Sequence, residues 1–318
     1  MAEKLLEVRD LKKYYKTKRG MLNAVDGIDF YINKGETLGL VGESGCGKST
    51  VGRTVLRLVE ATGGEVLFKG ENILLFKREK MRELRENMQI VFQDPFSSLN
   101  PRMSVSEIIA EPLKINKKAK DKAELHRMVQ SLMETVGLAE RLENSYPHEL
   151  DGGRRQRIGV ARALALNPQF IVMDEPVSAL DVSIQAQILN LMDNLQKELG
   201  LTYLFISHDL GVIKHVSDNI AVMYLGKIVE MSDYKSIFNN PLHPYTKALL
   251  SAIPIPDVDE KRERIILEGD VPSPIEPPPG CRFYGRCQVR QDICKDTTPE
   301  LREISQGRLC ACHFVDTL

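Results

Sequence analysis

Apolar and polar residues follow two periods along the chain, and these periods predict strands alternating with helices. Short apolar runs indicate strands at residues 5–8, 26–32, 36–41, 170–173, 202–207, 221–224 and 227–230, the last two joined as a hairpin. Apolar positions three and four apart indicate helices from residue 49 and over 122–136, 154–166 and 184–199. The alternation predicts an α/β fold with a mainly parallel sheet, and residues 104–165 are expected to form an inserted helical subdomain.

The composition changes near residue 240, and we place a domain boundary there. Ten of the 16 prolines fall at or after Pro241, and five of the six cysteines fall in the last 38 residues. We therefore expect one domain over residues 1–240 and a Pro- and Cys-rich extension over 241–318. Within the extension, residues 273–279 (SPIEPPP) are expected to form a stiff connector.

The overall composition, 42% apolar and 27% charged over 318 residues, is that of an ordinary globular protein. With 43 basic and 44 acidic residues, the formal net charge of −1 argues against a protein that coats nucleic acid. The longest runs without a charged residue have eleven residues, whereas a membrane-spanning helix needs about 20 mostly apolar ones. The first residues lack the features of a signal peptide, so we expect a cytoplasmic protein with reduced thiols.

The segment GESGCGKS at residues 42–49 matches the phosphate-binding pattern G-x-x-x-x-G-K-[ST] between a predicted strand and a predicted helix. Its glycines let backbone N–H groups converge on phosphate oxygens, and the helix start adds a favourable partial positive charge. Lys48 is expected to reach the terminal phosphates, and Ser49 to offer its hydroxyl to Mg²⁺. Cys46 is expected to contribute only its backbone.

A second group of candidates stands at the ends of later strands. Asp174 and Glu175 follow the apolar run 170–173, where Asp174 could hold Mg²⁺ through water and Glu175 could act as general base. Gln93 could reach both the metal and the water, and His208 could touch the γ-phosphate. Each residue alone has a simpler structural explanation, but beside a phosphate loop they indicate a nucleotide-hydrolysing site.

The tail concentrates five cysteines, Cys281, Cys287, Cys294, Cys310 and Cys312. An odd number in a reducing compartment fits disulfides poorly, and the close C-x₂₋₄-C pairs of structural zinc sites are missing. An iron–sulfur cluster needs four thiolates and tolerates varied spacing. Spacing alone therefore leaves zinc, an iron–sulfur cluster and plain free thiols open.

The motifs GESGCGKST, VFQDP, ELDGGRRQR, IVMDEP, SALD and FISHD occur in one order, which resembles the ATP-binding subunits of ABC transporters over about residues 5–235. The segments QDPFSSLNPRMSV, PVSALDVSIQAQ, NPLHPYTKALLSAIP and GCRFYGRC…ICKD resemble the ATPases of oligopeptide/dipeptide importers, most of all their F-type subunit. The resemblance covers essentially the whole chain. It implies a P-loop NTPase sheet of the ABC ATPase type.

The resemblance also implies a head-to-tail dimer in which ATP lies between the phosphate loop of one subunit and the signature motif of the other. Tyr15 would stack on adenine beside Tyr14, Gln93 would sense the nucleotide and face the membrane subunits, and residues 178–181 would link the two sites. The residues that it places at the catalytic centre are Glu175, His208 and Gln93. The nucleotide ligands that it implies are Gly42, Glu43, Ser44, Gly45, Cys46, Gly47, Lys48, Ser49 and Thr50, with Asp151, Gly152 and Gly153 of the signature; the Mg²⁺ ligands are Ser49, Gln93 and Asp174.

The signature departs from the family pattern at two positions. Residues 150–154 read L-D-G-G-R, where the family usually has L-S-G-G-Q. Asp151 places an anion where a Ser hydroxyl would donate to a bound polyanion. Since Asp is a good helix N-cap, the fold should tolerate it, but we expect it to oppose ATP-driven closure.

For the tail, the resemblance implies a [4Fe–4S] cluster held by Cys281, Cys287, Cys294 and Cys312, with His313 as a neighbour. It implies an ATPase coupled to peptide import, peripheral on the cytoplasmic face of the membrane. The partners implied are a second, D-type ATPase subunit, two transmembrane permease subunits and, indirectly, an extracytoplasmic peptide-binding protein, with no nucleic acid. The alternatives are a non-transport ABC ATPase acting on nucleic acid or ribosomes and an iron–sulfur redox protein with an incidental nucleotide site.

Overall fold

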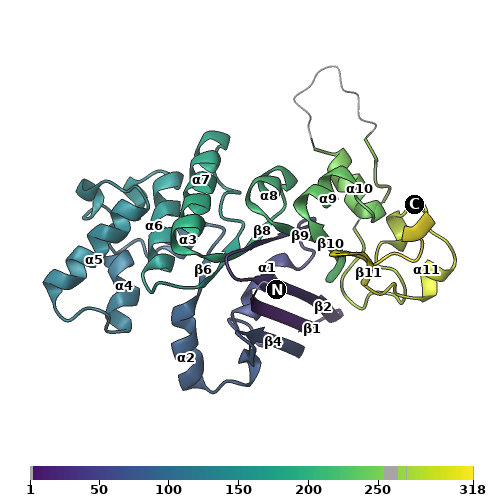
Figure 1. Ribbon diagram of the computed structural model, residues 1–318, viewed down its shortest axis with the longest axis horizontal. Coiled ribbons are helices and arrows are strands. Elements are labelled where there is room, and N and C mark those ends of the chain that lie inside the picture. Colours follow the sequence, from purple (N-terminus) through teal and green to yellow (C-terminus); the bar gives the residue numbers. More distant parts are fainter. Residues whose placement is uncertain (1–2, 254–263, 270, 318) are drawn as a thin grey trace. The chain divides into compact units, whose positions relative to one another are not determined.

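The structure is a computed structural model that describes residues 3–253, 264–269 and 271–317. The chain divides into two compact units, one formed by Met1–Leu75 with Phe205–Leu318 and the other by Phe76–Leu204. Figure 1 labels many of their helices and strands. The predicted boundary near residue 240 lies inside the first unit, and the division into 1–240 and 241–318 stays a prediction.

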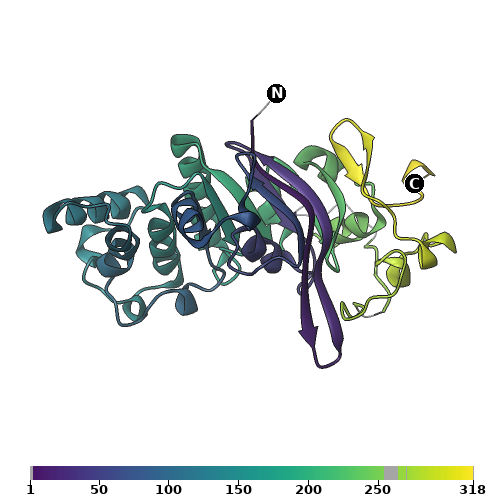
Figure 2. The ribbon, with the colours of Figure 1, turned by 90° about the horizontal axis from the view of Figure 1, so that it is seen from below.

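The first unit opens with a long antiparallel hairpin of β1 (Lys4–Thr17) and β2 (Gly20–Asn33), the purple ribbon in Figure 2. With β4 (Gly63–Phe68) and β5 (Glu71–Asn72) it forms a sheet in the order β2-β1-β4-β5, followed by a 3₁₀ turn, η1 (Ile73–Leu75). The sequence predicted only residues 5–8 and 26–32 of this hairpin. The rest of β1 lacks a regular alternation of apolar and polar residues because it carries charged residues. It forms a strand because it pairs with β2.

The second sheet of this unit surrounds β3 (Thr37–Val41), whose residues are all buried. Strand β9 (Asn219–Tyr224) pairs with β3 in parallel, and β10 (Lys227–Asp233) pairs with β9 antiparallel, which confirms the predicted hairpin. Beyond β10 the sheet continues with β12 (Arg308–Cys310) and β11 (Arg302–Ser305). On the other side of β3 lies β8 (Thr202–Ser207), through which the chain enters the unit. The helices are α1 (Lys48–Val55), α8 (Leu210–Val216), α9 (Tyr234–Asn239) and α10 (Pro244–Ser251).

The C-terminal extension belongs to the same unit and folds back on its sheets. Its short elements are η4 (Tyr284–Arg286), α11 (Ile293–Asp296) and η5 (Val315–Thr317). The predicted connector, residues 273–279, makes a bridge between Ile275 and Leu22 of β2, with a hydrogen bond from Asn23 N to Pro274 O (3.1 Å). The extension also adds β12 to the edge of β10, so it completes a sheet rather than trailing from it.

The second unit joins two parallel strands, β6 (Met88–Val91) and β7 (Phe170–Asp174), to a group of helices. Helices α4, α5 and α6 pack together, and all but two of the residues of α6 that follow its first turn are buried. Its helical elements are α2 (Arg78–Asn87), α3 (Pro95–Ser98), α4 (Val105–Ile115), α5 (Lys122–Thr135), η2 (Glu140–Leu142), η3 (Pro147–Glu149), α6 (Gly152–Leu164) and α7 (Val182–Leu199). The region 104–165 is therefore helical, as the apolar periodicity predicts. In the part of the chain described, none of the helices combines the length and the hydropathy needed to span a membrane.

Candidate functional site

The phosphate loop, residues 42–50, joins the buried strand β3 to α1 in the first unit. A Cβ at Gly42 would collide with the backbone oxygen of Met223, and one at Gly47 with the backbone oxygen of Ala24. Gly47 also has a φ of 109°, which other residues rarely adopt. Close packing against β2 and β9 therefore requires glycine at both positions.

Lys48 lies beneath this loop and is 4% exposed. Its Nζ donates to the carbonyl oxygens of Gly42 (2.7 Å) and Glu43 (3.0 Å). Helix α1 begins after Gly47 with no side-chain cap and no acidic residue in its first turn. Backbone donors at a helix start that no side chain caps, together with a lysine, form a favourable site for phosphate.

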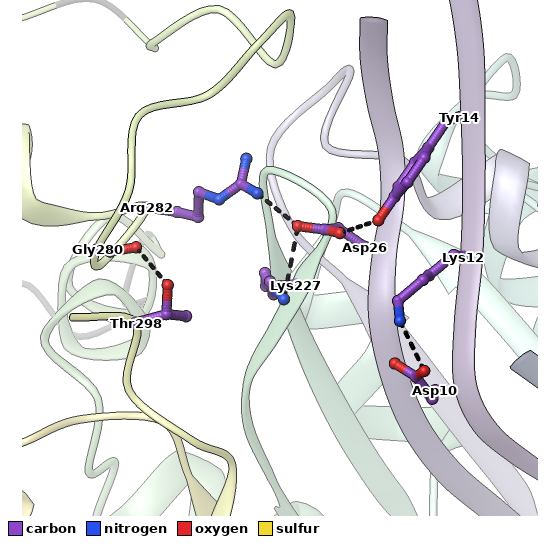
Figure 3. Close-up of polar contacts among 8 residues, drawn as sticks. All are labelled: Asp10, Lys12, Tyr14, Asp26, Lys227, Gly280, Arg282 and Thr298. Atoms are coloured by element: carbon purple, nitrogen blue, oxygen red, sulfur yellow. Dashed lines mark hydrogen bonds and ion pairs between the residues drawn. The ribbon is translucent and has the colours of Figure 1, made fainter. Parts of the chain in front are cut away.

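Tyr15 lies on β1 opposite Leu22, and the Nζ of Lys13 is 4.7 Å from the centre of its ring. Its neighbour Tyr14 donates through its hydroxyl to the carboxylate of Asp26 on β2, to which Lys227 (3.5 Å) and Arg282 are also paired (Figure 3). Burial works to raise the pKa of Asp26, but the Tyr14 hydrogen bond and the two cations outweigh it and lower that pKa below its ordinary value. Tyr14, next to the proposed adenine-stacking residue, is thus linked through Asp26 to Arg282 of the C-terminal extension.

The second unit brings together three residues from separate motifs. Gln93 follows β6, and its Nε2 donates to the Oε2 of Glu175 at 2.9 Å. Asp174 ends β7 and is 1% exposed, while Glu175 has a left-handed φ of 49°. Such a backbone conformation costs energy for a residue with a side chain and is often found at functional sites. Two residues that the sequence placed at the same attacking water are thus in direct contact.

The signature motif begins α6, also in the second unit. Asp151 is the N-cap: its Oδ1 accepts from Arg154 N (2.8 Å), and its Oδ2 lies 3.4 Å from Arg154 Nε. A Cβ at Gly152 would press on the side chain of Leu180, and one at Gly153 on that of Ile184. Gly152 therefore packs closely against the segment 178–181, which the resemblance assigns to linking the two ATP sites, and Gly153 packs against the first turn of α7 that follows it.

The predicted site residues fall into two groups according to unit. Tyr15, the phosphate loop and His208, which follows β8, belong to the first unit. Gln93, residues 151–153, Asp174 and Glu175 belong to the second. The joint roles predicted for the two groups stay predictions.

The cysteines of the extension are only partly arranged as predicted. Cys281, Cys287, Cys294 and Cys312 line one small cavity, whereas Cys310 is fully buried on β12 opposite Glu230. Among the described residues, however, no group of three or more His, Cys, Asp or Glu side chains could hold a metal ion. Burial raises the pKa of the Cys281 thiol to about 11, which favours the neutral form over the thiolate that a metal requires. The structure therefore does not support the predicted [4Fe–4S] cluster.

Sequence reasoning missed several residues that join the extension to the nucleotide-binding elements. Asp26 and Arg282 form one such pair, and Glu43 contacts both Tyr245 and Arg286. The only signal in the sequence was the run GCRFYGRC, whose two arginines flank the buried Phe283. Their partners lie more than two hundred residues away, so spacing could not identify them.

Comparisons with known proteins show which families the chain resembles. Residues 25–178 match the family model for ABC transporters, and residues 229–294 match that for the oligopeptide/dipeptide transporter C-terminal region. Among solved structures, the ATP-binding cassette MJ0796, a dimer bound to ADP and Pi in a post-hydrolysis state, has a TM-score of 0.66 and 28% identity, covering 72% of this chain and 98% of that one. The protein cbiO1 from Clostridium perfringens, part of an ABC transporter complex, also has a TM-score of 0.66 and 28% identity, covering 75% and 92%. These matches establish the ABC ATPase fold.

Curated relatives match over almost the full length. The oligopeptide transport ATP-binding protein AppF of Bacillus subtilis is 52% identical over 322 residues, which cover 98% of both chains. The oligopeptide transport ATP-binding protein OppF of Salmonella typhimurium is 51% identical over 325 residues, covering 99% of this chain and 97% of that protein. These relatives favour a transport ATPase over an ATPase acting on nucleic acid or ribosomes. The chain belongs to the ATP-binding subunits of oligopeptide ABC transporters, a family of transport ATPases.

Proposed function

We propose that the chain binds MgATP at residues 42–50 and hydrolyses it within an ATPase dimer that drives peptide import through separate membrane subunits. The observation that carries the proposal is the full-length identity to oligopeptide transport ATP-binding proteins, which includes the C-terminal region as well as the cassette. The phosphate loop supports it, because glycines, a buried lysine and a helix start without a side-chain cap converge there.

The roles of individual residues follow from their chemistry. The backbone N–H groups of the loop and the Nζ of Lys48 bind the phosphates, and Lys48 exchanges the carbonyls of Gly42 and Glu43 for phosphate oxygens. Tyr15 offers its ring to adenine. Gln93 holds the Glu175 carboxylate, which accepts the proton of the attacking water, and His208 donates to the γ-phosphate.

The donor set suits Mg²⁺. Ser49, Gln93 and Asp174 offer a hydroxyl, an amide and a carboxylate oxygen, and oxygen atoms are the ligands that this ion prefers. Held by these oxygens, Mg²⁺ would neutralise part of the negative charge of the phosphates. The buried position of Asp174 at the end of β7 limits the geometries that its carboxylate can adopt.

Coupling to transport rests on differential affinity. In the proposed head-to-tail dimer, ATP contacts the phosphate loop of one subunit and residues 151–153 of the other, so it favours the closed dimer over the open one. Hydrolysis and phosphate loss remove that preference, and reopening moves the membrane subunits held near Gln93. We propose a second, D-type ATPase subunit and two permease subunits as partners, with the chain peripheral on the cytoplasmic face of the membrane and a peptide-binding protein outside.

The test is reconstitution of the chain with its partner ATPase, the permease subunits and the peptide-binding protein in vesicles. We expect ATP hydrolysis to rise when the binding protein is loaded with peptide and labelled peptide to accumulate only with ATP. Peptide-independent hydrolysis with no accumulation would contradict the proposal. Stimulation by RNA or ribosomes instead would favour the alternative function.

The [4Fe–4S] cluster is retained only as a separate proposal, which rests on the family resemblance and on the cavity shared by Cys281, Cys287, Cys294 and Cys312. Anaerobically purified protein would then contain four iron and four sulfide per chain, and replacing any of the four cysteines with Ser would remove them, whereas Cys310→Ser would not. Stoichiometric zinc, or no metal at all, would contradict the cluster without affecting the ATPase proposal.

A further inference from the structure

The second residue of the phosphate loop is held by the C-terminal extension. The Oε2 of Glu43 lies 2.8 Å from Nη1 of Arg286, which ends the turn η4. The Arg286 side chain is 10% exposed and that of Glu43 27%. An ion pair so shielded from water is screened much less than one at the surface.

A second contact reaches the same residue through its backbone. The N–H of Glu43 donates to the hydroxyl of Tyr245 on α10 at 3.0 Å. Tyr245 is fully buried, and its ring packs against Tyr224 of β9 and Phe283 of the extension, with ring centres 4.7 and 5.4 Å away. Because Tyr245 is packed in this aromatic cluster and Arg286 pairs with the carboxylate, Glu43 is held at its backbone and its carboxylate at once.

The position of Glu43 matters to the lysine of the loop. Its carbonyl oxygen is one of the two that accept from Lys48 Nζ, and it also accepts from Cys46 N at 3.3 Å. Its carboxylate is the only acidic side chain among residues 42–50. Without Arg286 this charge would stand unneutralised beside a loop that must accept a triphosphate, and it would compete with the phosphates for Lys48.

The extension is anchored to the nucleotide-binding elements at a second point. Arg282, four residues before Arg286, pairs with Asp26 of β2, as Figure 3 shows, and the hydroxyl of Thr298 holds the Gly280 carbonyl just before it (3.0 Å). One arginine of the segment thus reaches the hairpin that carries Tyr15, and the other reaches the phosphate loop. The segment 280–287 therefore contacts both the hairpin and the phosphate loop.

We infer that Arg286 and Tyr245, both outside the phosphate loop, are positioning residues that keep Glu43 neutralised and in place for nucleotide binding. The inference rests on the proposed binding of ATP at residues 42–50. Arg286 acts on the nucleotide by neutralising the charge of Glu43. Tyr245 acts by accepting a hydrogen bond from the backbone N–H of Glu43. The extension therefore contributes to nucleotide binding as well as to the packing of the unit.

The test measures the dissociation constant of MgADP and of a slowly hydrolysed ATP analogue for the full chain. Arg286→Met should weaken binding about tenfold, the effect of losing one charge-assisted contact beside a polyanion. Arg286→Lys keeps the positive charge, so its nucleotide affinity should lie between that of the unaltered chain and that of Arg286→Met. Tyr245→Phe removes only a neutral acceptor and should weaken binding about threefold.

Two further variants separate the inference from general damage. Arg290→Met removes an exposed arginine of the same segment, which donates to Gly285 O and lies over the Tyr284 ring, and should leave affinity unchanged. Glu43→Gln combined with Arg286→Met removes the unneutralised carboxylate and should bind nucleotide several times more tightly than Arg286→Met alone. Thermal unfolding without nucleotide is measured for each variant.

The outcomes are distinct. If the unaltered chain fails to bind nucleotide, the proposed function is wrong. If it binds and Arg286→Met binds equally well, the inference is wrong. If the double variant is as weak as Arg286→Met, or if affinity only follows the loss of unfolding temperature, Arg286 supports the fold and does not act through Glu43, which also overturns the inference.

Discussion

Helix α1 begins after Gly47 and helix α6 begins after Asp151, and the two starts differ in the group that meets their first N–H donors. In α1 no side chain caps the first turn, and no acidic residue lies in it. In α6 the Asp151 carboxylate accepts from Arg154 N and also pairs with the Arg154 side chain. Both starts are proposed to face triphosphate, so the comparison shows one helix start suited to an external anion and one that carries an anion of its own.

The difference has a direct electrostatic consequence. An external phosphate at α1 meets backbone dipoles and Lys48, whereas a phosphate approaching α6 meets the Asp151 carboxylate first. Two unit charges about 4 Å apart repel by roughly 4 kcal/mol at an effective dielectric near 20. Arg154 and the N–H donors of α6 offset part of this, because the Asp151 side chain is already bound to them. The asymmetry between the two starts should therefore be measurable but moderate.

The largest expected effect comes from Glu175→Gln, which would hold both helix starts in their nucleotide-bound state. Removing a general base typically slows the chemical step by about 10²–10⁴-fold, while Gln keeps the size of the side chain and its contact with Gln93. Turnover at the site with this chain's phosphate loop is measured with the partner's site disabled. Nucleotide affinity should not change, and Glu198→Gln, an exposed position on α7, serves as the matched control. Full turnover in the variant would remove Glu175 from the mechanism.

A smaller effect is expected from removing the anion at α6. Asp151→Asn and Asp151→Ser both keep an N-cap and remove the charge, so the isolated chain should hydrolyse ATP several-fold faster and dimerise more readily with ATP. Asp151→Ala removes charge and cap together and should lower the free energy of unfolding by about 1 kcal/mol, which separates the two roles. Unchanged activity and dimerisation in the Asn and Ser variants would show that the carboxylate does not oppose the phosphate.

The smallest effect concerns a third helix start, that of α10, which carries Tyr245. His243 caps it through Nδ1, which accepts from Tyr245 N at 3.1 Å, and burial lowers the pKa of His243 to about 3. In the unfolded chain this histidine takes up a proton below about pH 6.5, and the folded chain does not, so stability must fall as the pH falls.

We expect this histidine to cost about 1 kcal/mol of unfolding free energy between pH 7 and pH 5.5. The cation of Lys247 also lowers the pKa of His243. Glu230, whose buried carboxylate accepts from His243 N (2.8 Å), has a raised pKa. Its titration therefore stabilises the folded chain as the pH falls, opposite to the effect of His243. His243→Asn keeps an acceptor for Tyr245 N, so the difference between the two unfolding curves isolates the histidine. Parallel curves over this pH range would refute the assignment.

Much of the fold could be predicted because it depends on local pattern. The helix predicted over 184–199 appears as Val182–Leu199 with Gly200 in the left-handed conformation behind it, since an apolar stripe and a terminal glycine specify both its face and its end. The hairpin around Leu225 and Gly226 also appears, with both residues at positive φ. The four-stranded antiparallel sheet was not expected, because its charged outer segments carry little periodicity and are ordered only by pairing with one another.

The sequence by itself determined the phosphate loop, the strand ends that carry Asp174 and Glu175, and the family of the chain. These features are contiguous motifs, and their chemistry follows from residue type and spacing. Only the tertiary structure decided that Gln93 contacts Glu175 and that Glu43 is held by Arg286. These two contacts join residues 82 and 243 positions apart, and which charges meet at such distances depends on how the intervening chain packs. The composition change near residue 240 predicts an appended tail, whereas packing makes its arginines part of the nucleotide site proposed here.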